Sequence, residues 1–181
     1  MLFRSKCTFL FLSRILYDKG IVELVEAMEM LFHKNKQVKL IIAGEVDSGN
    51  SGPVSKDWMD KKSNLSFIDW LGYIDDVVEL FSKADVVVLP SYREGVPHSL
   101  IEALAMGLPV ITTDTPGCRV VVEHGLNGFM VPSRDSNSLY DAMLQLANDP
   151  ELRQKFGKNS FAKSKEFDVE KVNKETMKLY N

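Results

Sequence analysis

Cysteine is scarce in this sequence, and its few cysteines are not arranged for a structural role. The chain has 181 residues and two cysteines, Cys7 and Cys118, which belong to no CxxC pair or Cys/His cluster. This pattern argues against a disulfide framework and against a zinc site. We therefore expect two reduced thiols in a cytoplasmic protein, and the sequence predicts no metal site.

Long apolar runs and targeting signals are also missing. No segment approaches the roughly 20 apolar residues that a transmembrane helix needs. The apolar stretch near the start is short, and Arg14 closes it without the small-residue cleavage site of a secretory signal peptide. The sequence therefore predicts neither a membrane span nor a cleaved leader.

An excess of positive charge and the common nucleotide-binding motifs are absent as well. The formal net charge is −3, so the composition gives no reason to expect a nucleic-acid-binding surface. There is no GxGxxG motif. Gly44 and Gly49 have the spacing of a P-loop, but in the Asn50-Ser51 pair that follows, Asn50 stands where that loop needs lysine. Any anionic ligand must then be met by a few local cations or by helix N-termini.

What the sequence does contain is a regular alternation of strands and helices. Apolar runs rich in β-branched residues predict strands at residues 7–13, 38–43, 65–71, 84–89, 110–113 and 129–131. Segments with helical spacing separate and follow them, and a last helix is expected after Asp168. The fold class predicted for residues 1–181 is a single α/β domain. It is a Rossmann-like parallel sheet of about six strands with helices on both faces.

Two glutamates after the fourth predicted strand are candidate ligand groups. Glu94 follows the strand directly, and Glu102 lies seven intervening residues later in a predicted helix. Carboxylates at these places can accept hydrogen bonds from sugar and ribose hydroxyls, and the N–H groups at the helix start can meet an anion. The alternatives are two solvated glutamates or a glycosidase acid/base pair. Spacing alone does not decide, although both carboxylates come from one loop and helix, which disfavours the glycosidase.

Two cations follow the first predicted strand, at the same edge of the predicted sheet. Arg14 and Lys19 are five residues apart in a connecting loop. Such a pair can clamp a diphosphate, because both side chains donate charge-assisted hydrogen bonds to phosphate oxygens. The alternative is two solvated loop charges, and spacing alone favours that alternative.

The segment PSYREGVPHSLIEALAMGLPVI, residues 90–111, strongly resembles the Glu-x7-Glu signature of glycosyltransferase family 4. The resemblance extends at ordered spacing from about Phe9 to Val131. It includes RILYDKG at residues 14–20, which looks like the family's Arg-x4-Lys-Gly element, and GLNGFMV at residues 125–131. The resemblance implies a retaining, metal-independent, nucleotide-sugar-dependent enzyme of the GT-B architecture, without a cofactor.

The resemblance also implies a role for each candidate residue. Arg14 and Lys19 would neutralise the donor diphosphate, Glu94 would hold hydroxyls of the transferred sugar, and these three would act in catalysis. Glu102 would bind the ribose. The other implied donor-binding residues are Tyr73 and Ile74 at the nucleobase and Gly95, Val96, Pro97, Ser99 and Leu100 around the sugar and phosphates.

Within the family, residues 92–97 and 116–119 are similar to a PglA-like subgroup that adds hexoses or N-acetylhexosamines to lipid-linked or surface glycans. This implies a UDP-sugar donor such as UDP-N-acetylgalactosamine and a glycan or lipid-linked acceptor. It also implies that the chain is the C-terminal, donor-binding half of a two-domain enzyme and is inactive without its N-terminal acceptor domain. The longer enzyme would be cytoplasmic or peripheral on the inner face of a membrane.

Val120 departs from the family pattern, because the family usually has glutamate at this position. The hydrogen bonds of that carboxylate near the donor loop are therefore lost. For this reason a non-catalytic sugar-nucleotide or protein-interaction module is one alternative. A GT-B sugar-nucleotide epimerase is a second alternative, which the Glu-x7-Glu element disfavours.

Overall fold

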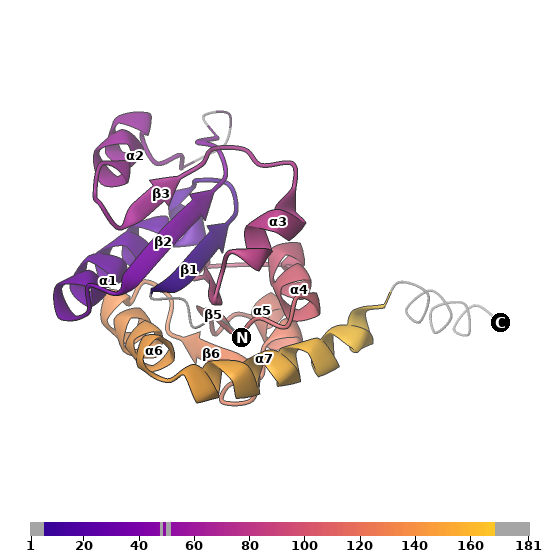
Figure 1. Cartoon of the computed structure of the whole chain (residues 1–181). Coiled ribbons are helices and arrows are strands. Elements are labelled where there is room, and N and C mark those ends of the chain that lie inside the picture. Colours follow the sequence, from indigo (N-terminus) through magenta and orange to yellow (C-terminus); the bar gives the residue numbers. More distant parts are fainter. Residues whose placement is uncertain (1–5, 48, 50–51, 169–181) are drawn as a thin grey trace.

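The computed structural model describes residues 6–47, 49 and 52–168 and shows one sheet enclosed by helices (Figure 1). The strands are β1 (Cys7–Leu12), β2 (Val38–Ala43), β3 (Ile68–Trp70), β4 (Val86–Leu89), β5 (Val110–Thr113) and β6 (Gly128–Val131). The helices are α1 (Ile21–Lys34), α2 (Lys56–Ser63), α3 (Val77–Ser82), α4 (His98–Ala105), α5 (Pro116–Val121), α6 (Ser136–Asn148) and α7 (Pro150–Ser164), with short 3-10 helices at Tyr17–Lys19 and Lys165–Phe167.

The described strands form a six-stranded sheet in the order β3-β2-β1-β4-β5-β6, and every neighbouring pair is parallel. This is the strand order of the doubly wound nucleotide-binding fold. β4 is buried along its whole length, as its run of three valines and a leucine predicts for a central parallel strand. The predicted fold class is confirmed, and β6 lies at one edge of the sheet.

Helices cover both faces of the sheet (Figure 1), and α1 packs on it through one apolar face. In α1, Leu24, Val25, Met28 and Leu31 recur at helical spacing and are fully buried. α1 packs against α6, and α4 packs against α7. The predicted helix start at Asp149 is also confirmed, since its side chain caps α7 by accepting the N–H of Leu152 at 2.8 Å.

Several sequence-based expectations need correction, and one lies outside the described residues. β1 ends at Leu12 rather than at residue 13, β4 begins at Val86 rather than at residue 84, and β6 begins at Gly128 rather than at residue 129. β3 starts at Ile68 rather than at residue 65, because residues 65–67 form the turn that leaves α2, with the Ile68 N–H donating to Leu65 O. The connection after β1 is not wholly polar, because Ile15 and Leu16 are buried in it. The helix predicted after Asp168 lies outside the described residues.

The strand order reverses between β1 and β4, so the loops that follow these two strands flank the topological switch point. In such sheets ligands bind in the crevice at the carboxyl ends of the strands, at this point. The two loops touch: Gly20 has a φ of 71°, and a β-carbon there would lie 2.1 Å from Pro90 O. Only glycine permits both the left-handed conformation and this close approach.

Candidate functional site

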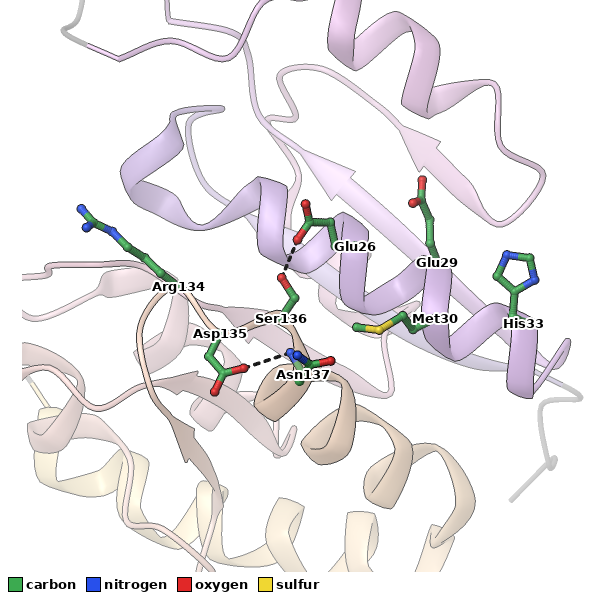
Figure 2. A pocket seen from close by; sticks show the side chains of 8 residues that line it. All are labelled: Glu26, Glu29, Met30, His33, Arg134, Asp135, Ser136 and Asn137. Carbon is green, nitrogen blue, oxygen red and sulfur yellow. Dashed lines mark hydrogen bonds between the residues drawn. The ribbon is translucent and has the colours of Figure 1, made fainter.

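One surface hollow, of about 580 Å³, lies away from the switch point, between α1 and the start of α6 (Figure 2). Its lining includes the carboxylates of Glu26, Glu29 and Asp135. Glu26 accepts a hydrogen bond from Ser136 Oγ at 2.6 Å, and Glu29 pairs with Lys62 at 2.5 Å. Arg134 and His33 also line the hollow, but three carboxylates beside a single guanidinium do not suit an anionic ligand. We therefore place the candidate site at the switch point instead.

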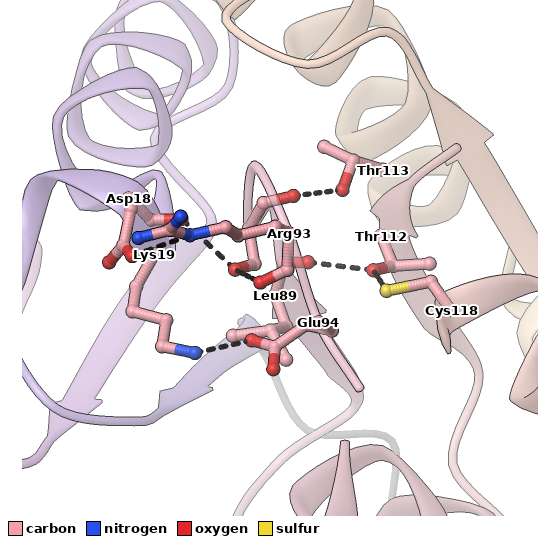
Figure 3. Close-up of polar contacts among 9 residues, drawn as sticks. Asp18, Lys19, Leu89, Arg93, Glu94, Thr112, Thr113 and Cys118 are labelled. Atoms are coloured by element: carbon pink, nitrogen blue, oxygen red, sulfur yellow. Dashed lines mark hydrogen bonds and ion pairs between the residues drawn. The ribbon is translucent and has the colours of Figure 1, made fainter. Parts of the chain in front are cut away.

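At the switch point the structure brings Lys19 and Glu94 together across the two loops (Figure 3). Lys19 Nζ lies 2.7 Å from Glu94 Oε1, and the two side chains are only 15% and 13% exposed. A pair this sheltered is screened by solvent far less than a surface pair. The candidate site therefore holds a cation and a carboxylate in direct contact, 75 residues apart in the sequence.

The main chain of the β4–α4 loop is fixed to the β1–α1 loop at Asp18. The Tyr92 N–H donates to Asp18 O at 2.7 Å, and Ser91 Oγ lies 3.0 Å from the same carbonyl oxygen. On the other side, Thr113 Oγ1 donates to Ser91 O and so ties the loop to the end of β5. These bonds hold the backbone in front of Glu94 before any ligand arrives.

The Tyr92 side chain forms a second connection, to α1. Its hydroxyl donates to Glu23 Oε1 at 2.5 Å, and the Arg134 guanidinium lies 4.6 Å from the centre of its ring. The pKa of Tyr92 is raised to about 12, mainly by burial and to a smaller extent by the hydrogen bond to Glu23. The hydroxyl therefore remains a hydrogen-bond donor at neutral pH.

The segment that runs from β5 into α5 packs against the β4–α4 loop at Gly117. A β-carbon at this position would lie 1.3 Å from Gly95 O and 2.4 Å from Glu94 O. No other residue type fits without displacing the backbone that carries Glu94. Cys118, the next residue, is fully buried, and burial raises the pKa of its thiol.

Arg14 does not share the contact between Lys19 and Glu94. Its Nη1 lies 3.0 Å from Asp47 Oδ2, on the loop after β2, and its side chain is 57% exposed. The structure thus places both predicted cations on the β1–α1 loop but pairs them with different carboxylates. Arg14 is the more accessible of the two for an incoming anion.

The start of α4 presents backbone as well as side chains. Gly95 and Val96 are exposed, Pro97 is buried and precedes the helix, and Ser99 is half-buried in the first turn. Leu100 is fully buried, and its N–H already donates to Pro97 O at 3.1 Å. Leu100 therefore has no free group for contact with a ligand, and its part is to shape the start of α4.

The remaining predicted residues are more open to solvent. Glu102 is exposed on α4, and its carboxylate has no hydrogen-bond or ion-pair partner within the described part of the chain. Tyr73, after β3, is 68% exposed, and a hydrogen bond to Asp75 raises the pKa of its hydroxyl. Ile74 is partly buried and packs against the core. A ligand that reached from Glu94 to Tyr73 would have to cross the ends of β1 and β2.

Several residues that shape the site were not singled out from the sequence. Asp18, Glu23 and Tyr92 act through contacts between distant loops, which no local pattern reveals. Gly117 belongs to a Pro-Gly pair that predicts only a turn, and nothing in the sequence shows that Gly95 lies against it.

The strand order defines an α/β domain of the doubly wound class, with a sheltered cation and carboxylate at its switch point. The chain belongs to the family of glycosyl transferases group 1, whose model matches residues 3–163. This confirms the family resemblance drawn from the sequence motifs, and the fold is that of GT-B glycosyltransferases.

Two relatives and one solved structure illustrate the similarity. The capsular polysaccharide biosynthesis glycosyltransferase CapM of Staphylococcus aureus is 32% identical over 149 residues, covering 82% of this chain and 39% of CapM. The N,N'-diacetylbacillosaminyl-diphospho-undecaprenol alpha-1,3-N-acetylgalactosaminyltransferase of Campylobacter jejuni is 29% identical over 172 residues, covering 95% and 44%. A variant of Staphylococcus aureus TarM, in complex with fondaparinux, alpha-GlcNAc-glycerol and UDP, superposes with a TM-score of 0.85 at 26% identity, covering 99% and 36%.

The chain spans about two fifths of the length of these curated relatives. In the part of the chain that the structure describes, no helix is both long and apolar enough to cross a membrane.

Proposed function

We propose that this chain is the donor-binding half of a retaining, metal-independent glycosyltransferase that uses a UDP-sugar. The observation that carries the proposal is the 2.7 Å contact between Lys19 and Glu94 at the topological switch point. A nucleotide sugar presents a diphosphate next to sugar hydroxyls. A sheltered ammonium beside a sheltered carboxylate is chemically matched to that pair of groups.

In this proposal the cations assist departure of the diphosphate. Lys19 binds the phosphates directly, and Arg14 exchanges Asp47 for a phosphate oxygen. Negative charge that builds up on the leaving diphosphate is then stabilised by fixed cations, so the chain's own side chains take the part that a metal ion plays elsewhere. Glu94 orients the sugar by accepting hydrogen bonds from its hydroxyls. No protein nucleophile is assigned.

The nucleoside is proposed to lie along the edge of the sheet toward β3. Glu102, which is exposed and unpaired within the described residues, binds the ribose hydroxyls, and Tyr73 and Ile74 lie against the base. Gly95, Val96, Pro97 and Ser99 line the sugar and phosphates. UDP is favoured as the nucleotide because TarM, at 26% identity, is described in complex with UDP.

The transferred group is proposed to be a hexose or an N-acetylhexosamine, and the acceptor a glycan or a lipid-linked sugar. The Campylobacter jejuni relative is named as an N-acetylgalactosaminyltransferase acting on a diphospho-undecaprenol substrate, and CapM is named for capsular polysaccharide biosynthesis. Because this chain spans about two fifths of each, we propose that it binds donor but transfers no sugar without an acceptor domain.

Isothermal titration calorimetry tests the proposal. The ligands are UDP and UDP-N-acetylgalactosamine, and the proteins are the unmodified chain, Lys19→Ala and the matched control Lys62→Ala. Lys62 also forms an ion pair, with Glu29, but on α2 rather than at the switch point. We expect Lys19→Ala to weaken both ligands at least tenfold, since it removes a charge-assisted contact to phosphate. Lys62→Ala should change neither.

Thermal unfolding of each variant verifies that the samples are folded. A folded, unmodified chain that binds neither ligand at millimolar concentration would contradict the proposal. Equal losses in Lys19→Ala and Lys62→Ala would show that the donor site lies elsewhere. Binding together with a failure of the chain, joined to an acceptor domain, to transfer sugar would favour a non-catalytic module.

A further inference from the structure

The sheltered ion pair between Lys19 and Glu94 determines what a ligand must provide at this site. Each of the two groups that would meet the donor is, without a ligand, the partner of the other. Burying an unpaired charge is costly, so neither group can leave the pair without a replacement. A ligand must therefore supply a partner for both groups, or one of them is left as an unpaired, sheltered charge.

A sugar-bearing donor supplies both partners. Its diphosphate replaces Glu94 as the anion beside Lys19, and its hydroxyls replace Lys19 as hydrogen-bond donors to Glu94. The nucleoside diphosphate left after transfer supplies only an anion for Lys19. When it binds Lys19, the Glu94 carboxylate, which is 13% exposed, has no cation beside it and faces the charge of the phosphates.

We infer that Glu94 is a specificity-determining residue that makes the site prefer the sugar-bearing donor over its own nucleoside diphosphate product, through exchange of the Lys19–Glu94 ion pair. This inference rests on the proposed function. It adds a consequence for turnover: loss of the sugar re-forms the ion pair and expels the product.

The surroundings of the pair support an exchange of side chains rather than a movement of the loops. The backbone before Glu94 is held by the Tyr92 N–H to Asp18 O bond, and Gly117 lies against Gly95 O. The long, flexible side chains of Lys19 and Glu94 are thus the parts free to re-pair. Figure 3 shows them reaching toward each other from two separate loops.

The test compares the ratio of dissociation constants, Kd for UDP over Kd for UDP-N-acetylgalactosamine, in three proteins. Glu94→Gln keeps the shape of the side chain but removes its charge, so UDP should bind more tightly and the donor less tightly. We expect the ratio to fall on the order of tenfold. Glu102→Gln is the matched control: both ligands contain the ribose it is proposed to bind, so its ratio should stay within about twofold of the unmodified chain. A ratio in Glu94→Gln equal to that of the unmodified chain overturns the inference.

A measurement on the unmodified chain covers the case in which Glu94→Gln does not fold. NMR of the Lys19 ammonium and the Glu94 carboxyl carbon reports on the ion pair directly. Saturating UDP should shift the Glu94 signal to that of an unpaired carboxylate. With UDP-N-acetylgalactosamine the Glu94 signal should not reach that position, because the sugar hydroxyls take the place of Lys19. Persistence of the empty-state signals of both groups with either ligand bound overturns the exchange.

Inorganic pyrophosphate separates failure of this inference from failure of the proposed function. It has neither ribose nor sugar, so it tests only the competition between Glu94 and an anion for Lys19. Tighter pyrophosphate binding by Glu94→Gln than by the unmodified chain supports the exchange even if UDP-sugars do not bind. Equal pyrophosphate binding by the two proteins overturns it even if they do.

Discussion

The α-carbon of Gly117 lies directly against the carbonyl group of Gly95, so that a β-carbon at position 117 would stand 1.3 Å from Gly95 O. Gly117 is the second residue of α5, and Gly95 follows the glutamate that pairs with Lys19. The position of Glu94 therefore depends on the absence of a side chain 23 residues further along the chain.

Gly117→Ala tests this dependence. The added methyl group must displace backbone rather than a flexible side chain, and we expect a loss of about 1–3 kcal/mol in the free energy of unfolding, as for overpacking of a core. UDP-N-acetylgalactosamine affinity should also fall, because the backbone that carries Glu94 moves. Chemical denaturation and calorimetry measure the two effects. Gly49→Ala is the control, because its nearest neighbour is a side-chain oxygen at 3.5 Å. Unchanged stability of Gly117→Ala would show that the loop yields freely.

Tyr92→Phe removes the hydroxyl that donates to Glu23 at 2.5 Å. The other carboxylate oxygen of Glu23 is already buried without a hydrogen-bond partner among the described residues. We expect a loss of about 1.5–3 kcal/mol in the free energy of unfolding, because the variant leaves a partly buried charge with no donor. Denaturant titration gives the value. Tyr140→Phe is the control, since no partner of the Tyr140 hydroxyl is found within the described part of the chain. A similar loss in both variants would argue against the role of Glu23.

The same tyrosine predicts a dependence of stability on pH. The pKa of Tyr92 in the folded chain is about 12, above its ordinary value of 10.0. A group whose pKa is raised on folding contributes stability that is complete below pH 10 and is lost as the pH rises toward 12. The stability difference between the unmodified chain and Tyr92→Phe should therefore narrow across this interval. Comparing the two proteins cancels the titration of Cys7, whose pKa burial raises to about 12. A difference that is constant from pH 9 to 12 would contradict the assignment.

Lys19 and Glu94 should also be coupled in stability. Lys19→Met leaves a sheltered carboxylate unpaired, and Glu94→Leu leaves a sheltered ammonium unpaired, so each single change should cost about 3 kcal/mol. The double variant should cost less than the sum of the two, because it leaves no unpaired charge. Chemical denaturation of the unmodified chain, the two single variants and the double variant completes this double-mutant cycle. Strict additivity would mean that the two side chains do not interact in solution.

Much of the fold follows from local patterns in the sequence. The runs that became β2 and β5 predict those strands with their bounds, because each is a short apolar run closed by turn residues. β3 is shorter than its apolar run, because Leu65 and Phe67 are used to turn the chain back from α2. Apolar character alone does not distinguish a strand residue from a buried turn residue.

The sequence predicts where the candidate side chains lie but not how they pair. The positions of Arg14, Lys19, Glu94 and Glu102 after predicted strands place them near one edge of a parallel sheet, and their role in binding stays a prediction. These positions do not reveal that Lys19 contacts Glu94 while Arg14 contacts Asp47, because those choices depend on how two loops meet at the switch point. The support from Tyr92 and Gly117 depends equally on contacts between segments far apart in the sequence.

Amide chemical shifts locate the donor on the chain when UDP-N-acetylgalactosamine is titrated into isotopically labelled protein. If the donor binds at the switch point, the largest shifts fall on the loops after β1 and β4, including Lys19, Gly20, Glu94 and Gly95. Smaller shifts should follow the sheet edge toward Tyr73. Shifts gathered instead around the hollow that includes Glu26, Glu29 and His33, with the switch-point loops unmoved, would contradict donor binding at the switch point.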